Sequence, residues 1–235
     1  MKTVLLFFFA LLCIASDAQT DTAAPVKVDY TTKVYKQGDV WKKEDRWIST
    51  GALAFDGSFA DSALIMPTGI WSWYNKEQVL IMKKEFDKYQ LKDHYVYFNN
   101  GKQKMHASFV NDSLTNVKGW DSLGNEIQGF IYQQPASFPG GLSKWRNYLI
   151  KAINTNTPKD FKKGNIEGVV QVSFIIDKDG NLTDVAVKRS SGYTELDEHA
   201  LNVIRNSPKW IPGIQYNEKV KYRQIQPVVY KLVDK

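Results

Sequence analysis

The order of helix and strand patterns in the last hundred residues, from about Pro135 to Leu232, constrains the fold more than any other feature of the chain. Two stretches repeat apolar residues at helical spacing, and three stretches have the pattern of strands. Their order is helix, strand, strand, helix, strand. Two helices with one apolar face each must cover one face of a three-stranded antiparallel sheet. The sequence therefore predicts a small α+β domain at the C-terminal end.

Each predicted helix has one apolar stripe. The first stripe consists of Leu142, Trp145, Leu149 and Ile153, with Tyr148 and Ala152 beside it. The second stripe consists of Leu196, Ala200, Val203 and Ile204. The segment Asn154 to Pro158 ends the first helix because proline cannot continue it. Thr194 and Asp197 predict a capping box at the start of the second helix.

The two central strands are predicted to form a hairpin. Val170, Val172, Phe174 and Ile176 share one strand face, and Gln171 and Ser173 lie on the other. Asp177 to Asn181 then turns the chain into a partner strand from Leu182 to Val187. The acidic turn also suggests calcium, but an EF-hand loop needs glycine at its sixth position, and here glycine is fourth. We therefore expect a hairpin turn without a metal.

The first residues, 1–18, have the pattern of an export signal. Lys2 is followed by an apolar run from Val4 to Ala15, and small residues predict cleavage after Ala18. The alternative is an uncleaved anchor, but about twelve residues span only about 18 Å as a helix, against a hydrocarbon core of about 30 Å. A lipid anchor at Cys13 is disfavoured by the preceding Leu12. We expect a periplasmic protein.

Composition excludes several kinds of site. Once residues 1–18 are removed, no cysteine remains, which excludes disulfides, thiolate metal sites and cysteine nucleophiles. His94, His106 and His199 fall at no metal-ligand spacing, and we expect them at the surface or in turns. The net charge of +6 is spread along the chain, so no nucleic-acid patch is predicted. We expect no cofactor and no metal.

The N-terminal half is predicted to be a β-rich domain over residues 41–132, of antiparallel meander type. Residues 19–40 are polar and are predicted to form a flexible lead-in. From Trp41 onward, short runs alternate aromatic and polar residues, which places the rings on one strand face. Asn100-Gly101 predicts a hairpin with a type I′ turn. The aromatic residues are interpreted as core, with a carbohydrate-stacking platform as the alternative.

A faint period of about 24 residues runs through this half. Three segments share an aromatic residue, a turn and polar residues: 73–77, 97–101 and 119–125. This pattern resembles the MORN-like hairpin repeats of secreted bacterial proteins. An unrelated β-rich domain is the alternative interpretation.

The C-terminal half, residues 135–235, begins after a break at Gln133 to Ser137. It resembles the C-terminal domain of TonB in the version common in Bacteroidetes-type sequences. The resemblance rests on Phe138-Pro139-Gly140-Gly141, on Ile166-Glu167-Gly168 and the alternating strand after it, on Asp179-Gly180, and on Trp210-Ile211-Pro212-Gly213. Its structural positions are Pro139, Gly140, Gly168, Gly180, Trp210, Pro212 and Gly213. Between Pro208 and Pro212, Trp210 is expected to fill the seam between helices and sheet.

This resemblance implies a protein of outer-membrane transport that is not an enzyme. In the family, a receptor segment called the TonB box adds itself as a strand to the sheet edge. The corresponding candidates here are Lys219, Lys221, Tyr222, Arg223, Gln224, Ile225 and Gln226. The cations among them are also explained as solvated charges that discourage aggregation. Pro227 is expected to stop pairing or to form a bulge. Two copies pairing through their sheet edges are a further expectation.

Two other functions are weighed against this one. A membrane-anchored energy transducer needs a retained anchor and a long proline-rich spacer, and the chain shows neither pattern. A secreted hydrolase has little support, because Ser190-Ser191-Gly192 lacks the Gly-x-Ser-x-Gly elbow. Asp177 and Asp179 lie in a turn, and no histidine has an evident acidic partner.

Overall fold

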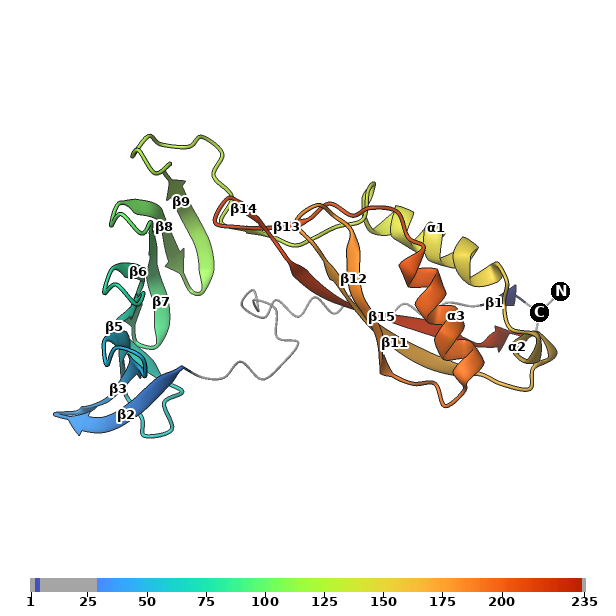
Figure 1. Cartoon of the computed structure of the whole chain (residues 1–235), viewed down its shortest axis with the longest axis horizontal. Helices are drawn as coiled ribbons and strands as arrows, with labels where there is room; N and C mark the ends of the chain where they lie inside the picture. The colour runs from blue at the N-terminus through green and yellow to red at the C-terminus, as the bar shows by residue number, and fades with distance from the viewer. Residues whose placement is uncertain (1–2, 5–28, 234–235) are drawn as a thin grey trace. The chain divides into compact units, whose positions relative to one another are not determined.

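The computed structural model describes residues 3–4 and 29–233 (Figure 1). The chain divides into two compact units, one formed by Ala24–Tyr132 and the other by Gln133–Lys235 together with Met1–Ala23. The predicted export signal lies outside the described residues except for Thr3 and Val4. Within the described ranges, no helix is long and apolar enough to cross a membrane.

The N-terminal unit is one antiparallel meander of eight strands in chain order (Figure 1). The strands are β2 (Tyr30–Gln37), β3 (Val40–Trp47), β4 (Leu53–Phe59), β5 (Pro67–Tyr74), β6 (Leu80–Asp87), β7 (Gln90–Tyr97), β8 (Gln103–Val110) and β9 (Ser113–Gly119). The predicted antiparallel meander is confirmed. It begins at Tyr30, inside the stretch predicted to be a flexible lead-in, because β2 pairs with β3 along its whole length.

One face of the meander carries a cluster of aromatic rings, and Tyr35 and Tyr95 lie on the other face. Phe55 is paired with Trp73, and Trp73 is paired with Met82, so these side chains share a face. The opposite face carries charged and hydroxyl side chains at the intervening positions, such as Lys83 beside Ser72. Alternation of this kind gives a sheet with one apolar and one wet side. At the far end, the ring of Phe130 covers Gly119, where a Cβ would lie 1.8 Å from Phe130 Cδ2.

The turn between β7 and β8 differs from its prediction. Only Gly101 has positive φ, at 79°, whereas a type I′ turn needs positive φ at both central residues. Gly101 N–H donates to Phe98 O at 2.9 Å, and the β7–β8 register shifts between Val96 and Tyr97. These features define a three-residue hairpin loop with a glycine bulge. The hairpin prediction is confirmed, and the turn type is wrong.

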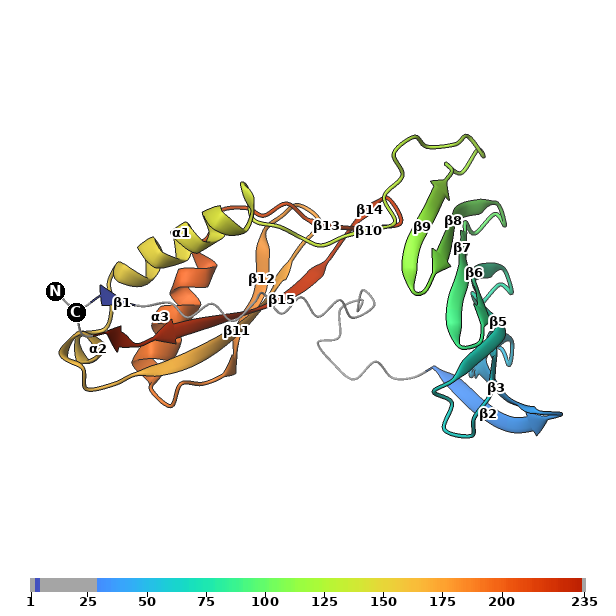
Figure 2. The same cartoon turned by 180° about the vertical axis from the view of Figure 1, so that it is seen from behind.

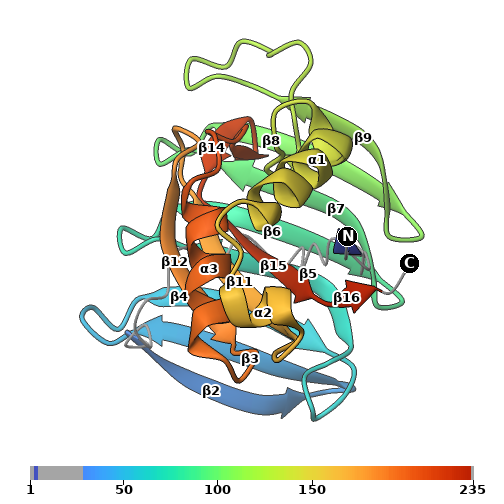
Figure 3. The same ribbon diagram turned by 90° about the vertical axis from the view of Figure 1, so that its right-hand side faces the viewer.

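The C-terminal unit contains a three-stranded antiparallel sheet in the order β12-β11-β15. Its elements are β10 (Gln133–Gln134), α1 (Gly141–Asn154), α2 (Lys159–Lys163), β11 (Gly168–Ile176), β12 (Leu182–Arg189), α3 (Thr194–Arg205), β13 (Gly213–Gln215), β14 (Glu218–Val220) and β15 (Tyr222–Tyr230). The helices lie on one side of this sheet (Figure 3). A second small sheet has the order β10-β13-β14 (Figure 2). The predicted sheet with helices is confirmed, and α2 was not predicted.

One apolar core joins the helices to the sheet. The predicted strand face is fully buried, and so are most residues of both helical stripes. Trp210 fills the seam, because its ring lies 4.9 Å from that of Trp145 and 5.7 Å from that of Phe174. Leu142 is the exception, at 55% exposure. Phe138, from the segment before α1, is buried instead, and its ring centroid lies 5.1 Å from that of Trp145.

The start of α3 is built differently from the predicted capping box. The N-cap residue is Tyr193, which makes no side-chain cap, and Thr194 is already helical. Asp197 instead accepts hydrogen bonds from the backbone N–H of Ser191 at 2.9 Å and from its hydroxyl at 2.8 Å. Partial burial would raise the pKa of Asp197, but the hydrogen bond from the Ser190 hydroxyl and those from Ser191 lower it. The carboxylate therefore secures the preceding loop rather than the helix end.

Candidate partner-binding edge of the C-terminal sheet

Strand β15 forms one border of the three-stranded sheet. It pairs with β11 over nine residue pairs, from Gly168 with Tyr230 to Ile176 with Tyr222, without a register shift. Within the described part of the chain, no strand pairs with the other side of β15. The next strand, β16 (Leu232–Val233), pairs with β1 (Thr3–Val4) in a separate two-stranded sheet. A strand border of this kind presents backbone groups to a guest strand.

The proline in β15 does not interrupt the ladder, so the expectation of a stop or bulge at Pro227 is wrong. Pro227 is paired with Gln171, and pairing continues on both sides. Proline has no N–H to donate, and residues of an antiparallel strand alternate in the side to which their N–H and C=O point. Pairing at Pro227 is therefore unbroken because its nitrogen points away from β11, as an edge strand allows.

This orientation fixes which backbone groups face the open side. Residues two and four positions from Pro227 point the same way, so Arg223, Ile225 and Val229 direct both N–H and C=O outward. Tyr222, Gln224 and Gln226 direct theirs toward β11. Of the candidate residues within β15, only Arg223 and Ile225 thus direct backbone groups to the open side.

Gln226 and Pro227 interrupt the row of outward backbone groups at its middle. Gln226 Nε2 donates to Pro227 O at 2.8 Å, and Trp145 Nε1 donates to Gln226 Oε1 at 2.8 Å. The side chains of Gln224 and Gln226 are buried on the helix side. These two side chains therefore pack against the helices, while a guest strand would lie beside β15 in the plane of the sheet.

The two lysine candidates lie before β15. Lys219 is in β14, where it is paired with Ile214 of β13, and Lys221 lies between β14 and β15. Arg223 is exposed within β15. The structure therefore divides the predicted closing segment between two sheets and brings together only the part from Tyr222 onward.

Comparison with known proteins finds a family model that matches part of the C-terminal unit. Residues 156–232 match the family model for the Gram-negative bacterial TonB protein C-terminal. The matched stretch includes β11, β12, α3 and β15. That family is a transport-related domain family without enzymatic activity. TonB family proteins are periplasmic or membrane-associated in Gram-negative bacteria.

The other comparisons add little. No curated protein matches the chain. A crystal structure of a GtfA/B complex bound to UDP and GlcNAc aligns with 14% identity and a TM-score of 0.27, covering 41% of this chain and 21% of that one. This chain thus spans about a fifth of that protein's length. Similarity at this level carries no conclusion about fold or function.

The structural positions expected for the TonB-like domain fall at turns and strand starts. Gly140 is the N-cap of α1 with φ 81°, next to the exposed Pro139. Gly168 begins β11 against Ser191, and Gly213 begins β13 with Pro212 before it. Gly180 has φ 84°, and a Cβ there would lie 2.1 Å from Trp210 O.

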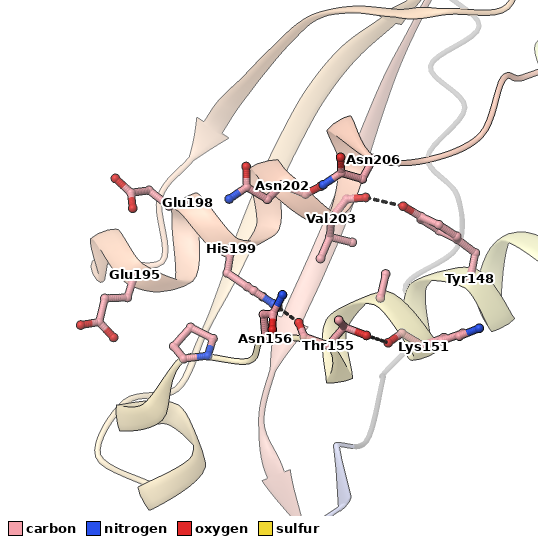
Figure 4. A pocket seen from close by; sticks show the side chains of 12 residues that line it. Tyr148, Lys151, Thr155, Asn156, Glu195, Glu198, His199, Asn202, Val203 and Asn206 are labelled. Atoms are coloured by element: carbon pink, nitrogen blue, oxygen red, sulfur yellow. Dashed lines mark hydrogen bonds between the residues drawn. The ribbon is translucent and has the colours of Figure 1, made fainter.

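A groove of about 720 Å³ lies between α1 and α3 in the TonB-like domain (Figure 4). Tyr148 Oη donates to Val203 O at 2.8 Å and joins the two helices. At its base, the ring of His199 bonds Tyr230 Oη at 2.7 Å and Thr155 O at 2.9 Å. Burial raises the pKa of Tyr230, so its hydroxyl stays protonated. These contacts tie β15 to both helices.

The histidines differ from the sequence-based prediction in their burial and in their partners. His94 and His199 are buried, so the prediction of surface or turn positions is wrong for them. Strand and helix periodicity place both on core faces, which was the available signal. His106 has an acidic partner after all, because its Nε2 lies 2.6 Å from Asp93 Oδ1.

The Asp93, His106 and Ser108 cluster does not form a hydrolase triad. In such a triad, the histidine stands between the carboxylate and the hydroxyl. Here Ser108 Oγ donates to Asp93 Oδ1 at 2.9 Å and lies 3.4 Å from His106 Nε2, so the hydroxyl and the carboxylate meet the same imidazole nitrogen. Among the described residues, no group of three histidine, cysteine or acidic side chains could hold a metal ion.

Proposed function

We propose that this chain is an exported periplasmic protein, associated with the outer membrane, that binds an extended segment of an outer-membrane TonB-dependent receptor. The segment adds as a strand to the open side of β15. The observation that carries the proposal is the unpaired side of β15 inside a domain matched by the TonB C-terminal family. A guest strand would satisfy backbone groups that otherwise bond water.

The outward groups set the size of the guest. Arg223 and Ile225 offer two donors and two acceptors, and Pro227, whose oxygen accepts from Gln226 Nε2, separates them from the outward groups of Val229. Each such hydrogen bond contributes only about 0.5–1.5 kcal/mol net, so a short segment binds weakly and reversibly through this row alone. A guest of about five residues opposite Tyr222–Gln226 fits a strand of about 17 Å. Arg223 favours an acidic side chain on the guest.

We also propose that the N-terminal meander is built from MORN-like hairpin repeats. Tyr74 ends β5, Tyr97 ends β7, and Trp120 directly follows β9; each precedes a turn, and they are 23 residues apart. In the first and third of these turns, the side chain directly after the aromatic residue caps the loop: Asn75 Oδ1 accepts from Val79 N at 2.9 Å, and Asp121 Oδ1 accepts from Asn125 N at 2.9 Å. The repeated geometry supports a repeated hairpin unit.

The edge proposal is tested with Ile225→Pro in the full chain. The substitution removes an outward N–H without removing a hydrogen bond to β11, so the fold should persist. The probes are synthetic peptides covering the N-terminal segments of TonB-dependent receptors from the same bacterium. We expect binding by the wild type, protection of the Arg223 and Ile225 amides from hydrogen exchange, and at least about tenfold weaker binding by Ile225→Pro.

The matched control is Ile225→Val, which keeps the N–H and a β-branched side chain and should bind within about twofold of the wild type. Equal binding by Ile225→Pro and the wild type would contradict strand addition at this edge. So would peptide binding that leaves the β15 amides unprotected.

A further inference from the structure

The aromatic face of the meander holds a pocket of about 400 Å³. It is lined by Tyr30, Lys43, Asp45, Phe55, Phe59, Leu64, Trp71 and Trp73. These residues come from β2 to β5 and the β4–β5 turn, so the pocket is contained in the N-terminal unit. Its volume lies in the range of about 300–1,000 Å³ that is usual for small-molecule sites.

The walls of the pocket are aromatic rings held in fixed positions. Phe55 and Phe59 are buried and form the floor. Trp71 packs against Phe59 with 4.6 Å between ring centroids, and its Nε1 donates to Ser58 O at 2.8 Å. Trp73 packs against Phe55 at 5.0 Å. Both indoles are only half-buried and present rigid apolar surface to a ligand.

An ion pair lies among these rings. Lys43 Nζ is 3.1 Å from Asp45 Oδ2, and Thr32 Oγ1 donates to Asp45 Oδ1 at 2.6 Å. Asp45 is only 5% exposed. Lys43 also lies over the ring of Phe55, 5.3 Å from its centroid. The pocket therefore combines flat apolar walls with one fixed acceptor and one fixed donor.

The charges exclude several kinds of ligand. Asp45 neutralises Lys43, but a cation would still be repelled by Lys84, which lies 5.7 Å from the Trp73 ring centroid. An anion would approach the carboxylate of Asp45. An apolar side chain from a protein partner would strip water from the ion pair without replacing its hydrogen bonds, which is costly. A neutral ligand with an apolar face and several hydroxyls avoids all three penalties.

We propose that this pocket binds a pyranose unit of a neutral glycan. The C–H face of the sugar ring would stack on Trp73 and Trp71, and its hydroxyls would donate to Asp45 and accept from Lys43. A pocket of this size holds one or two sugar rings. This activity is additional to strand binding at β15 and does not depend on it.

The test uses the full chain with cellotetraose and maltotetraose as probes, measured by calorimetry. We expect the wild type to bind at least one of them with a Kd of about 1 mM or below. Trp73→Leu removes the stacking surface, and Asp45→Asn keeps the shape while changing the acceptor. Each should weaken binding by about tenfold or more. Trp120→Leu, a tryptophan outside the pocket, should leave binding within about twofold of the wild type.

Thermal unfolding of each variant verifies that it is folded, and the near-isosteric Asp45→Asn keeps the test valid if Trp73→Leu unfolds. The proposal is overturned if the wild type binds neither sugar at about 10 mM. It is also overturned if Asp45→Asn and Trp120→Leu weaken binding equally. A dimer that forms in solution and is disrupted by Trp73→Leu would show that a second copy covers the pocket, and would overturn it too.

Discussion

At the scale of single residues, the buried polar groups decide how the molecule responds to its surroundings. His94 is 1% exposed, and its Nδ1 lies 2.9 Å from Tyr132 Oη. Burial, with a smaller contribution from the charge of Lys84, lowers the pKa of His94 to about 3. The folded state therefore holds this imidazole neutral at a pH where the unfolded chain protonates it.

The expected consequence is acid destabilisation that begins well above the range of the carboxylates. Between pH of about 6.5 and 3, the unfolded chain binds one more proton, so the free energy of unfolding falls as pH falls, by about 1.4 kcal/mol per unit. Asp93, whose pKa is lowered, decreases the free energy of unfolding only below a pH of about 3.8. Urea titrations at pH 6.5 and 5 should show this loss in the wild type and a smaller loss in His94→Gln. Equal losses would contradict the assignment.

Gly180 offers a second prediction at this scale. Its φ of 84° and the contact with Trp210 O together exclude a side chain. Gly180→Ala should lower the free energy of unfolding by about 2–4 kcal/mol, from left-handed backbone strain and overpacking. Gly192 is the matched control, because its φ is 92° and a Cβ there would have no atom within 4 Å. Gly192→Ala should cost only about 1 kcal/mol. Equal costs in thermal or urea unfolding would show that the Trp210 contact is unimportant.

At the scale of elements, the two sides of β15 have different roles. The side toward β11 is fully paired, and the outward side is interrupted where Gln226 and Pro227 meet. An uninterrupted border would favour pairing between copies of the chain, and proline at an edge is a known protection against that. The same residue therefore limits both the length of a guest and the tendency to self-associate.

Replacing this proline tests that role. Pro227→Val restores an outward N–H and leaves pairing with β11 intact, so we expect more dimer in sedimentation experiments at equal concentration. Adding Ile225→Pro to this variant should return the dimer fraction to the wild-type value, because it removes the neighbouring outward donor. A dimer fraction unchanged in Pro227→Val would contradict the assignment of its nitrogen to the open side.

At the scale of the whole molecule, periodicity predicted more than local chemistry did. The stripes that include Trp145 and Val203 and the strand face of Phe174 were recognisable, because burial follows helix and strand periods. The direction of the Pro227 nitrogen was not recognisable, because the sequence does not show which neighbouring strand the N–H of a strand residue faces. Burial of His94 depended on the register of β6, β7 and β8 together. The aromatic pocket likewise required strands β2 to β5 to be aligned.

Strand order in the meander is the same as chain order, so every strand from β3 to β8 pairs with the strand before it and the strand after it. A hairpin can therefore be inserted or removed without rethreading the rest. Each such change would lengthen or shorten the sheet by about 10 Å, two strand spacings. In evolution or in engineering, the length of this sheet can therefore be changed by changing the number of hairpins.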